Sequence, residues 1–252
     1  MNTTEPLLEL RDVSFRYTSA QVLETINLTV RAGELKALLG PNGGGKSTLL
    51  KIGLGILKPQ LGEARLFSEP ASRFKGWSRI GYVPQAGPRQ GAQLLPFTAA
   101  EVVAMGLPRR PLGWLRGGGQ GSAEAVAEAL AATGVERLAK RQLQDLSTGQ
   151  QQRVMVAQAL VKRPRMLILD EPDASVDSAG KEHLHELLHR INAESGVAIL
   201  LVSHDIGAVC ARDWWCVCIN CSLTYEGPSA KLSRTALAAT YGHQVELLEH
   251  GT

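Results

Sequence analysis

The stretch ELKALLGPNGGGKSTLLKIGLGIL, from Glu34 to Leu57, decides the fold of this 252-residue chain. Its apolar beginning predicts a buried strand, its cluster of glycines predicts a loop, and the residues that follow predict a helix. The letters GPNGGGKS (Gly40–Ser47) fit the phosphate-loop pattern G-x-x-x-x-G-K-[ST] in the strand-to-helix context that the pattern requires. That context argues against the alternative, a glycine-rich turn without a ligand.

This loop predicts a nucleotide site. Its glycines let backbone N–H groups curl around phosphate oxygens, and the N-terminus of the next helix attracts the same negative charge. Lys46 is placed to reach the β- and γ-phosphates, and the hydroxyl of Ser47 to bind Mg²⁺.

Strand and helix patterns extend from the loop in both directions. The segments LLELRDVSFRY (7–17) and QVLETINLTV (21–30) alternate apolar and polar residues, as half-buried antiparallel strands do. VAILLV (197–202) is typical of a parallel strand buried on both faces. From about residue 98 to 162 the pattern is helical, with a loop GGGQG at 117–121 that we expect to be flexible. The sequence therefore predicts an α/β fold interrupted by a helical insert.

Composition narrows the class of protein. A hydrophobic content of 44% with 20% charged residues is typical of a soluble globular protein. The net charge of +3 is too small to indicate nucleic-acid binding. We find neither an apolar run long enough to span a membrane nor a secretion signal, so we expect any link to a membrane to run through a partner.

Two groups of residues could bind a metal and are better explained otherwise. Cys210, Cys216, Cys218 and Cys221 match no familiar zinc spacing, and WWCVCIN is typical of a buried strand. His185 and His189 lie four residues apart on a predicted amphipathic helix, and we interpret them as a solvated helix face.

A second chemical motif is MLILDEP (Met166–Pro172). Its apolar residues predict a buried strand that ends in Asp170, which can hold Mg²⁺ through water. Glu171 is then placed to polarise an attacking water molecule. An exposed strand end with two carboxylates is the alternative, and the phosphate loop upstream argues against it.

A third motif, DLSTGQQQRVMVAQAL (Asp145–Leu160), is a small polar turn followed by a helix. Together the three motifs resemble the ATP-binding subunit of ABC transporters over nearly the full chain. The resemblance implies a P-loop NTPase core with an antiparallel β subdomain and an inserted α-helical subdomain, the ABC ATPase fold. It implies one domain over 1–252, with the core at 1–97 and 163–252 and the helical subdomain at 98–162.

The resemblance also implies that two cassettes pair head to tail. The turn that contains LSTGQ then closes over the γ-phosphate held by the phosphate loop of the other chain. This accounts for the presence of two phosphate-binding turns in one chain.

Roles follow from the same motifs. Tyr17 corresponds to the aromatic residue that stacks on adenine, Gln85 to the glutamine that contacts Mg²⁺ and the attacking water, Asp177 to the aspartate at the dimer interface, and His204 to the histidine that touches the γ-phosphate. The implied catalytic residues are Glu171, His204 and Gln85, and the implied Mg²⁺ ligands are Ser47, Gln85 and Asp170. The implied ATP-binding residues are Tyr17, Gly40, Pro41, Asn42, Gly43, Gly44, Gly45, Lys46, Ser47, Thr48, Ser147, Gly149, Gln150 and Asp177.

Two residues depart from the family pattern. Thr148 stands where the first glycine of LSGGQ is usual, and its Cβ is expected to constrain the turn because glycine alone reaches positive φ freely. Gly44 replaces a common alanine, which we expect to be harmless.

The cargo is indicated by weaker similarities. The segment Phe97–Arg116 and the tail from CVCINCSLTYEGPSAKL to YGHQVELLEH resemble importers of manganese, zinc or iron ions. Iron–siderophore and cobalamin importers share much of this pattern and remain an alternative. The resemblance implies a second copy of the chain, separate membrane permease subunits, an extracytoplasmic metal-binding protein as an indirect partner, and a peripheral position at the cytoplasmic face of the membrane.

Other functional classes fit less well. ABC proteins of DNA repair insert long coiled coils before the signature turn, ribosome-acting members usually carry two cassettes, and nucleotide kinases have no use for LSTGQ. We therefore expect a transport ATPase.

Overall fold

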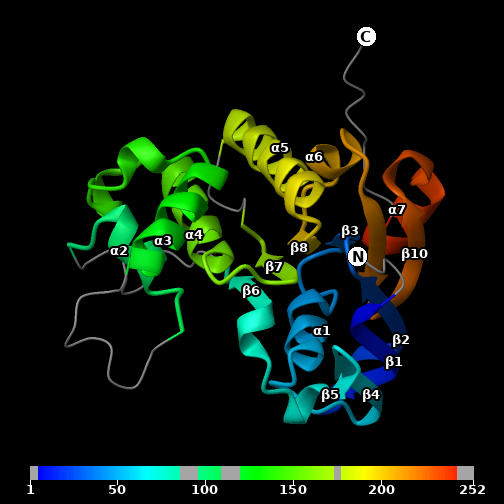
Figure 1. Cartoon of the computed structure of the whole chain (residues 1–252). Helices are drawn as coiled ribbons and strands as arrows, with labels where there is room; N and C mark the ends of the chain where they lie inside the picture. The colour runs from blue at the N-terminus through cyan, green and yellow to red at the C-terminus, as the bar shows by residue number, and fades with distance from the viewer. Residues whose placement is uncertain (1–4, 86–95, 109–119, 173–176, 243–252) are drawn as a thin grey trace. The chain divides into compact units, whose positions relative to one another are not determined.

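The computed structural model describes residues 5–85, 96–108, 120–172 and 177–242. The chain forms two compact units, one made of Met1–Lys75 with Ala198–Thr252 and the other of Gly76–Val197. The first unit contains β1 (Pro6–Arg16), β2 (Gln21–Arg31), β3 (Leu35–Leu39), α1 (Lys46–Gly53), β4 (Leu61–Leu66), β5 (Glu69–Pro70), β8 (Ala198–Ser203), α6 (Ile206–Cys210), β9 (Trp215–Asn220), β10 (Ser222–Pro228) and α7 (Arg234–Tyr241) (Figure 1). The second unit contains β6 (Ile80–Val83), α2 (Ala99–Ala104), α3 (Gln120–Ala132), α4 (Thr148–Leu160), β7 (Met166–Asp170) and α5 (Ser178–Ser195).

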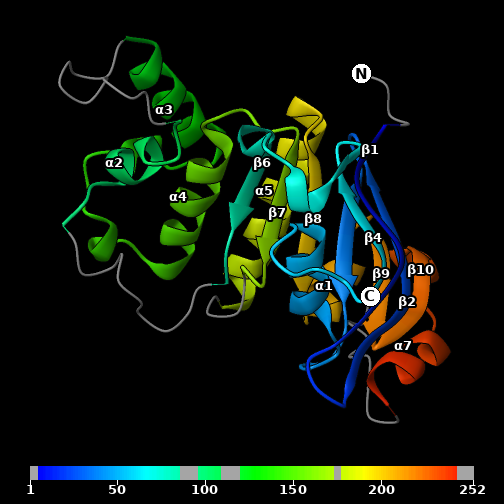
Figure 2. The same ribbon diagram turned by 90° about the horizontal axis from the view of Figure 1, so that it is seen from below.

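The strands of the first unit form an antiparallel sheet and a second group in which β3 pairs in parallel with its neighbours. An antiparallel sheet has the order β2-β1-β4-β5, which confirms the two amphipathic strands expected near the N-terminus. In the other set, β3 lies parallel to both β8 and β9, and β9 pairs antiparallel with β10. All six residues of β8 are buried, as expected for a parallel strand with both faces covered. Figure 2 shows α7 beside β9 and β10 at the edge of this unit.

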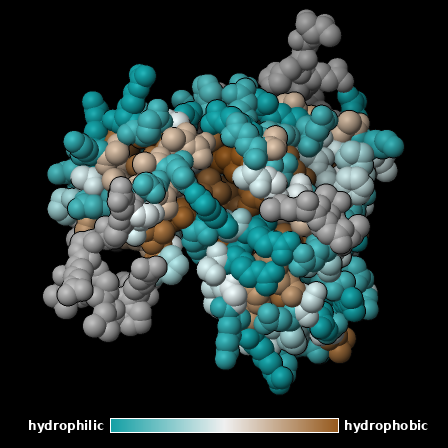
Figure 3. Space-filling model, viewed as in Figure 1, coloured by the Kyte–Doolittle hydropathy of each residue, from teal (hydrophilic) through white to brown (hydrophobic). Residues whose placement is uncertain are grey.

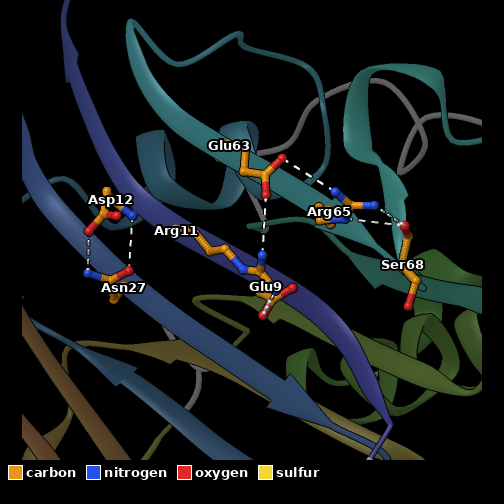
Figure 4. Close-up of polar contacts among 7 residues, drawn as sticks. All are labelled: Glu9, Arg11, Asp12, Asn27, Glu63, Arg65 and Ser68. Carbon is orange, nitrogen blue, oxygen red and sulfur yellow. Dashed lines mark hydrogen bonds and ion pairs between the residues drawn. The ribbon is translucent and has the colours of Figure 1, made fainter.

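The solvent face of the antiparallel sheet carries alternating charges (Figure 4). Glu9 and Arg11 on β1 lie opposite Arg65 and Glu63 on β4. The guanidinium of Arg11 lies 2.9 Å from Glu9 and 3.6 Å from Glu63, and that of Arg65 lies 3.4 Å from Glu63. Such exposed pairs add little to stability because water and salt screen them, so their main effect is to favour this strand register.

The second unit has its own helical core. α2, α3 and α4 bury one another's apolar residues, including Val103, Leu130 and Val154, each at most 1% exposed. The unit also contains the parallel pair β6–β7. The expected loop at 117–121 is partly wrong, because α3 already begins at Gln120 and includes Gly121. Residues 117–119 lie outside the described ranges.

The expectation of a solvated face on α5 is wrong for His185. Leu184, Leu187, Leu188 and Ile191 form the predicted buried stripe, and His185 is only 1% exposed. Residue 185 follows Leu184 directly and lies three positions before Leu188, so it stands at the border of this stripe. The packed surface of α5 is wider than the leucine pattern alone indicates.

Two of the four cysteines lie in the buried strand that the sequence predicts, whereas Cys210 and Cys221 lie outside it and are partly buried. Cys216 and Cys218 are buried in β9, and burial raises the pKa of their thiols to about 12 and about 11. Within the described ranges, no cluster of three or more His, Cys, Asp or Glu side chains is arranged to hold a metal ion.

Among the described residues, no helix has both the length and the apolar character that crossing a membrane requires. Figure 3 shows hydrophilic residues over much of the visible face.

Candidate nucleotide-binding site

The phosphate loop lies between β3 and α1, where the sequence predicts it. Gly43 and Gly45 have φ values of +82° and +97°, a region that side chains with a Cβ rarely adopt. The Lys46 ammonium, 4% exposed as a residue, donates to the carbonyl oxygens of Gly40 at 2.8 Å and Pro41 at 3.1 Å. The loop therefore holds its lysine at the start of α1, which is the arrangement that phosphate binding requires.

The loop is seated on the end of β9. The N–H of Cys221 donates to the carbonyl of Gly44 at 3.2 Å. A Cβ placed on Gly40 would lie 2.2 Å from the carbonyl oxygen of Ile219, which is far inside van der Waals contact. A Cβ on Gly44 would meet Pro41 and Ile219 at 3.1–3.2 Å, so an alanine there is a tight fit. The end of β9 thus restricts positions 40 and 44 of the loop, and the positive φ values restrict positions 43 and 45.

We expect Gly40→Ala to lower the free energy of unfolding by about 1–3 kcal/mol, because the new methyl group overpacks against backbone that cannot easily move. ATP affinity should fall with it, since the loop must shift. Gly121→Ala is the matched control: a Cβ there meets nothing within 4 Å, and alanine favours the helix by up to about 1 kcal/mol. Urea unfolding and binding of a fluorescent ATP analogue measure both effects. Equal stability of the two variants would contradict this account of Gly40.

Tyr17 and Thr48, both expected at the nucleotide, lie together in the first unit. The Tyr17 hydroxyl lies 3.4 Å from the Thr48 hydroxyl, and the Tyr17 ring packs edge-on against Phe15 with 5.0 Å between centroids. Tyr17 is nevertheless 58% exposed. A positioned aromatic ring with a free surface is suited to stacking on a base.

The two carboxylates at the end of β7 lie in the second unit. Every residue of β7 is buried, and Asp170 and Glu171 are each only 9% exposed. The side-chain amide of Gln85 donates to the Glu171 carboxylate at 2.7 Å. Glu171 also has a φ of +45°, a conformation that costs a non-glycine residue about 1–3 kcal/mol and that clusters at functional sites. The structure thus brings Gln85 and Glu171 together.

Tyr82 is a residue at this site that sequence reasoning missed. Its hydroxyl donates to the Asp170 carboxylate at 3.5 Å. Burial raises the pKa of Tyr82, and the charge and hydrogen bond of Asp170 raise it further, so this hydroxyl stays protonated at neutral pH. The only available signal was a tyrosine three positions before Gln85, and no spacing rule links it to Asp170.

The signature turn forms the N-terminus of α4. Ser147 is the N-cap: its hydroxyl accepts from the N–H of Gln150 at 3.4 Å, and the Gln150 side chain accepts from the N–H of Ser147 at 3.1 Å. Thr148 is the first residue of the helix, is exposed, and has no positive φ. The expected constraint from its Cβ is therefore wrong, because this position does not need glycine. A Cβ on Gly149 would also meet nothing within 4 Å.

Two further expected site residues lie at the ends of elements. Asp177 is exposed and caps α5, where its carboxylate accepts from the N–H of Gly180 at 2.9 Å. His204 is exposed and directly follows β8. The structure therefore places Tyr17, the phosphate loop and His204 in the first unit. It places Gln85, the signature turn, Asp170, Glu171 and Asp177 in the second.

Residues 23–174 match the family model for ABC transporters. The chain belongs to the ABC transporter family. It is an ATP-binding cassette, the class of domain that hydrolyses ATP to drive transport. It is 39% identical to the zinc uptake system ATP-binding protein ZurA of Listeria innocua, over 88% of this chain and 85% of that protein.

Solved structures agree with this membership. The cassette matches cbiO1 of Clostridium perfringens, part of the ABC transporter complex cbiONQ, with a TM-score of 0.76 and 30% identity over 93% of this chain and 94% of that one. It also matches the ATP-binding cassette MJ0796 in a dimeric post-hydrolysis state bound to ADP and Pi, with a TM-score of 0.68 and 27% identity over 88% and 98% of the two chains.

Proposed function

We propose that this cassette hydrolyses ATP to power the uptake of zinc through separate membrane permease subunits. The observation that supports zinc most directly is the similarity to ZurA, which extends along most of both chains. Manganese and iron, and beyond them siderophore-bound iron or cobalamin, are the competing cargoes. The cassette would then work at the cytoplasmic face of the membrane, held there by the permease.

The residues present fit bound MgATP. The positive φ values of Gly43 and Gly45 open backbone N–H groups toward a phosphate, Lys46 supplies a positive charge, and Tyr17 offers an exposed ring for adenine. When bound, Mg²⁺ neutralises charge that develops on the phosphate oxygens. Ser47, Asp170 and Gln85 offer the oxygen ligands that this ion prefers.

Glu171 would act as the general base. Burial to 9% exposure keeps its carboxylate out of bulk water, and the Gln85 amide fixes its direction. The amide nitrogen of Gln85 makes this hydrogen bond, so its amide oxygen would remain available to the Mg²⁺ ion and the attacking water. His204 would contact the γ-phosphate.

The signature turn would serve a second copy of the chain. The capped N-terminus of α4 presents N–H groups and an exposed Ser147 to solvent, which suits an anion brought by another molecule. The dimeric state of MJ0796 supports this arrangement. In the proposed dimer, each turn with its Ser147, Gly149 and Gln150 closes over the ATP held by the other phosphate loop, and Asp177 lies at the interface.

The permease would dock on the helical insert. Residues 97–108 of the segment that resembles metal importers are described, and 109–116 lie outside the described ranges. At the end of α2, Met105 is 52% exposed and would be available to a protein partner. An extracytoplasmic metal-binding protein would act on the permease from the other side of the membrane.

Whole-cell metal analysis tests the cargo. We expect cells that lack this chain to contain less zinc than wild type when a chelator keeps free metal scarce. Added zinc or re-expressed wild-type chain should restore the content, whereas Glu171→Gln should not, because uptake needs hydrolysis. A deficit in manganese or iron alone would move the proposal to that ion. A defect confined to siderophore or cobalamin uptake would support the competing class, and no uptake defect of any kind would refute the transport function.

A further inference from the structure

Two side chains from one short segment contact both carboxylates at the end of β7. β6 and β7 run parallel with Tyr82 beside Ile168 and Val83 beside Leu169. This register brings the end of β6 alongside the residues that follow Leu169. Tyr82 then donates to Asp170, and Gln85, just beyond β6, donates to Glu171. The function described above uses three of these four residues and gives Tyr82 no task.

We propose that Tyr82 is a positioning residue that orients the Asp170 carboxylate for the cation of MgATP. The proposal rests on the proposed function of Asp170 as a ligand of that cation. Tyr82 itself contacts neither the cation nor ATP in this role. It acts through Asp170 alone.

The physical reason is the freedom of an aspartate side chain. Rotation of a carboxylate about its last bond has broad, shallow minima, so backbone position alone does not set the plane of the two oxygens. A hydrogen bond from a donor on the neighbouring strand favours one orientation of the carboxylate. Tyr82 is suited to this because its strand is fixed in register to β7. Donors of this kind behind a metal ligand typically affect metal affinity by about 10- to 100-fold.

Partial exposure of Tyr82 makes the proposal testable. Tyr82 is 42% exposed, so we expect removal of its hydroxyl to leave the strand and the ring packing in place. Tyr225→Phe is the matched control. The Tyr225 hydroxyl donates to the carbonyl of Pro228 at 2.8 Å on β10, and neither residue is assigned to the site.

The experiment measures cation binding without turnover. Mn²⁺ replaces Mg²⁺, a non-hydrolysable ATP analogue is present, and electron paramagnetic resonance reports free and bound Mn²⁺ for the full chain. We expect Tyr82→Phe to weaken Mn²⁺ binding about tenfold, the low end of the usual range because 3.5 Å is a long hydrogen bond. Nucleotide affinity in EDTA and the Tm should stay at wild-type values, and Tyr225→Phe should leave Mn²⁺ binding unchanged.

Other outcomes refute the proposal in distinguishable ways. Wild-type Mn²⁺ affinity in Tyr82→Phe would overturn it, provided Asp170→Asn loses affinity in the same assay, and the proposed function would then stand. Unchanged affinity in Asp170→Asn would remove Asp170 from the cation site and Tyr82 with it. An equal loss of metal-free nucleotide affinity or a lowered Tm in Tyr82→Phe would show a general packing role instead.

Discussion

Replacing Glu171 by glutamine is expected to slow ATP turnover by about 10²- to 10⁴-fold, the usual contribution of a general base, while ATP binding stays intact. Glutamine has the same shape and can still accept the hydrogen bond from Gln85 that the structure shows at 2.7 Å. It cannot accept a proton from water at neutral pH. The change therefore removes the base without removing the geometry around it, and steady-state phosphate release measures the loss.

Glu182→Gln provides the control for this experiment. Glu182 is exposed on α5, so the same chemical change there should leave turnover at the wild-type rate. Binding of a fluorescent ATP analogue to both variants separates affinity from chemistry. Turnover of Glu171→Gln at the rate of Glu182→Gln would exclude Glu171 as the base.

Mixing two inactive variants is expected to restore activity. Lys46→Ala lacks the charge on the phosphate loop, and Ser147→Arg blocks the signature turn, so each homodimer has two defective sites. A heterodimer has both defects in one site and an intact second site. Random pairing puts half of the dimers in this form, so we expect about a quarter of wild-type turnover if the sites work independently.

The mixing experiment restores activity only if each ATP site combines the phosphate loop of one chain with the signature turn of the other. If the signature turn served the ATP of its own chain, a heterodimer would have one defect in each site and the mixture would stay inactive. Ser147→Ala measures the cost of losing the helix cap by itself, about 1 kcal/mol of stability. Unchanged turnover of a Ser147→Arg monomer would contradict the assignment in trans.

The sequence predicted the structure correctly where neighbouring residues determine it. The strand, loop and helix expected in Glu34–Leu57 are β3, the phosphate loop and α1, because glycines, an apolar run and a lysine act locally there. β7 ends at Asp170 as expected. A short apolar run that ends in a carboxylate is typical of a buried parallel strand, which places the carboxylate at the end of the strand.

Contacts between segments that are distant in the sequence could not be predicted from the sequence. The bond from Tyr82 to Asp170 joins residues 88 positions apart and depends on the register of β6 and β7, which no local pattern encodes. The burial of His185 depends on how widely α5 is covered. The error at Thr148 has another cause: the glycine of the family pattern was taken as a backbone requirement, whereas the helix begins there with ordinary φ.

The most direct test of the account is the molar mass of Glu171→Gln with ATP and Mg²⁺. Two copies should close around two ATP molecules and, with hydrolysis blocked, should stay closed. Size-exclusion chromatography with light scattering should then give about twice the 27.1 kDa of one chain, and adding Lys46→Ala to the same chain should return it to the monomer. A Glu171→Gln chain that binds ATP and remains at 27.1 kDa would contradict the shared site.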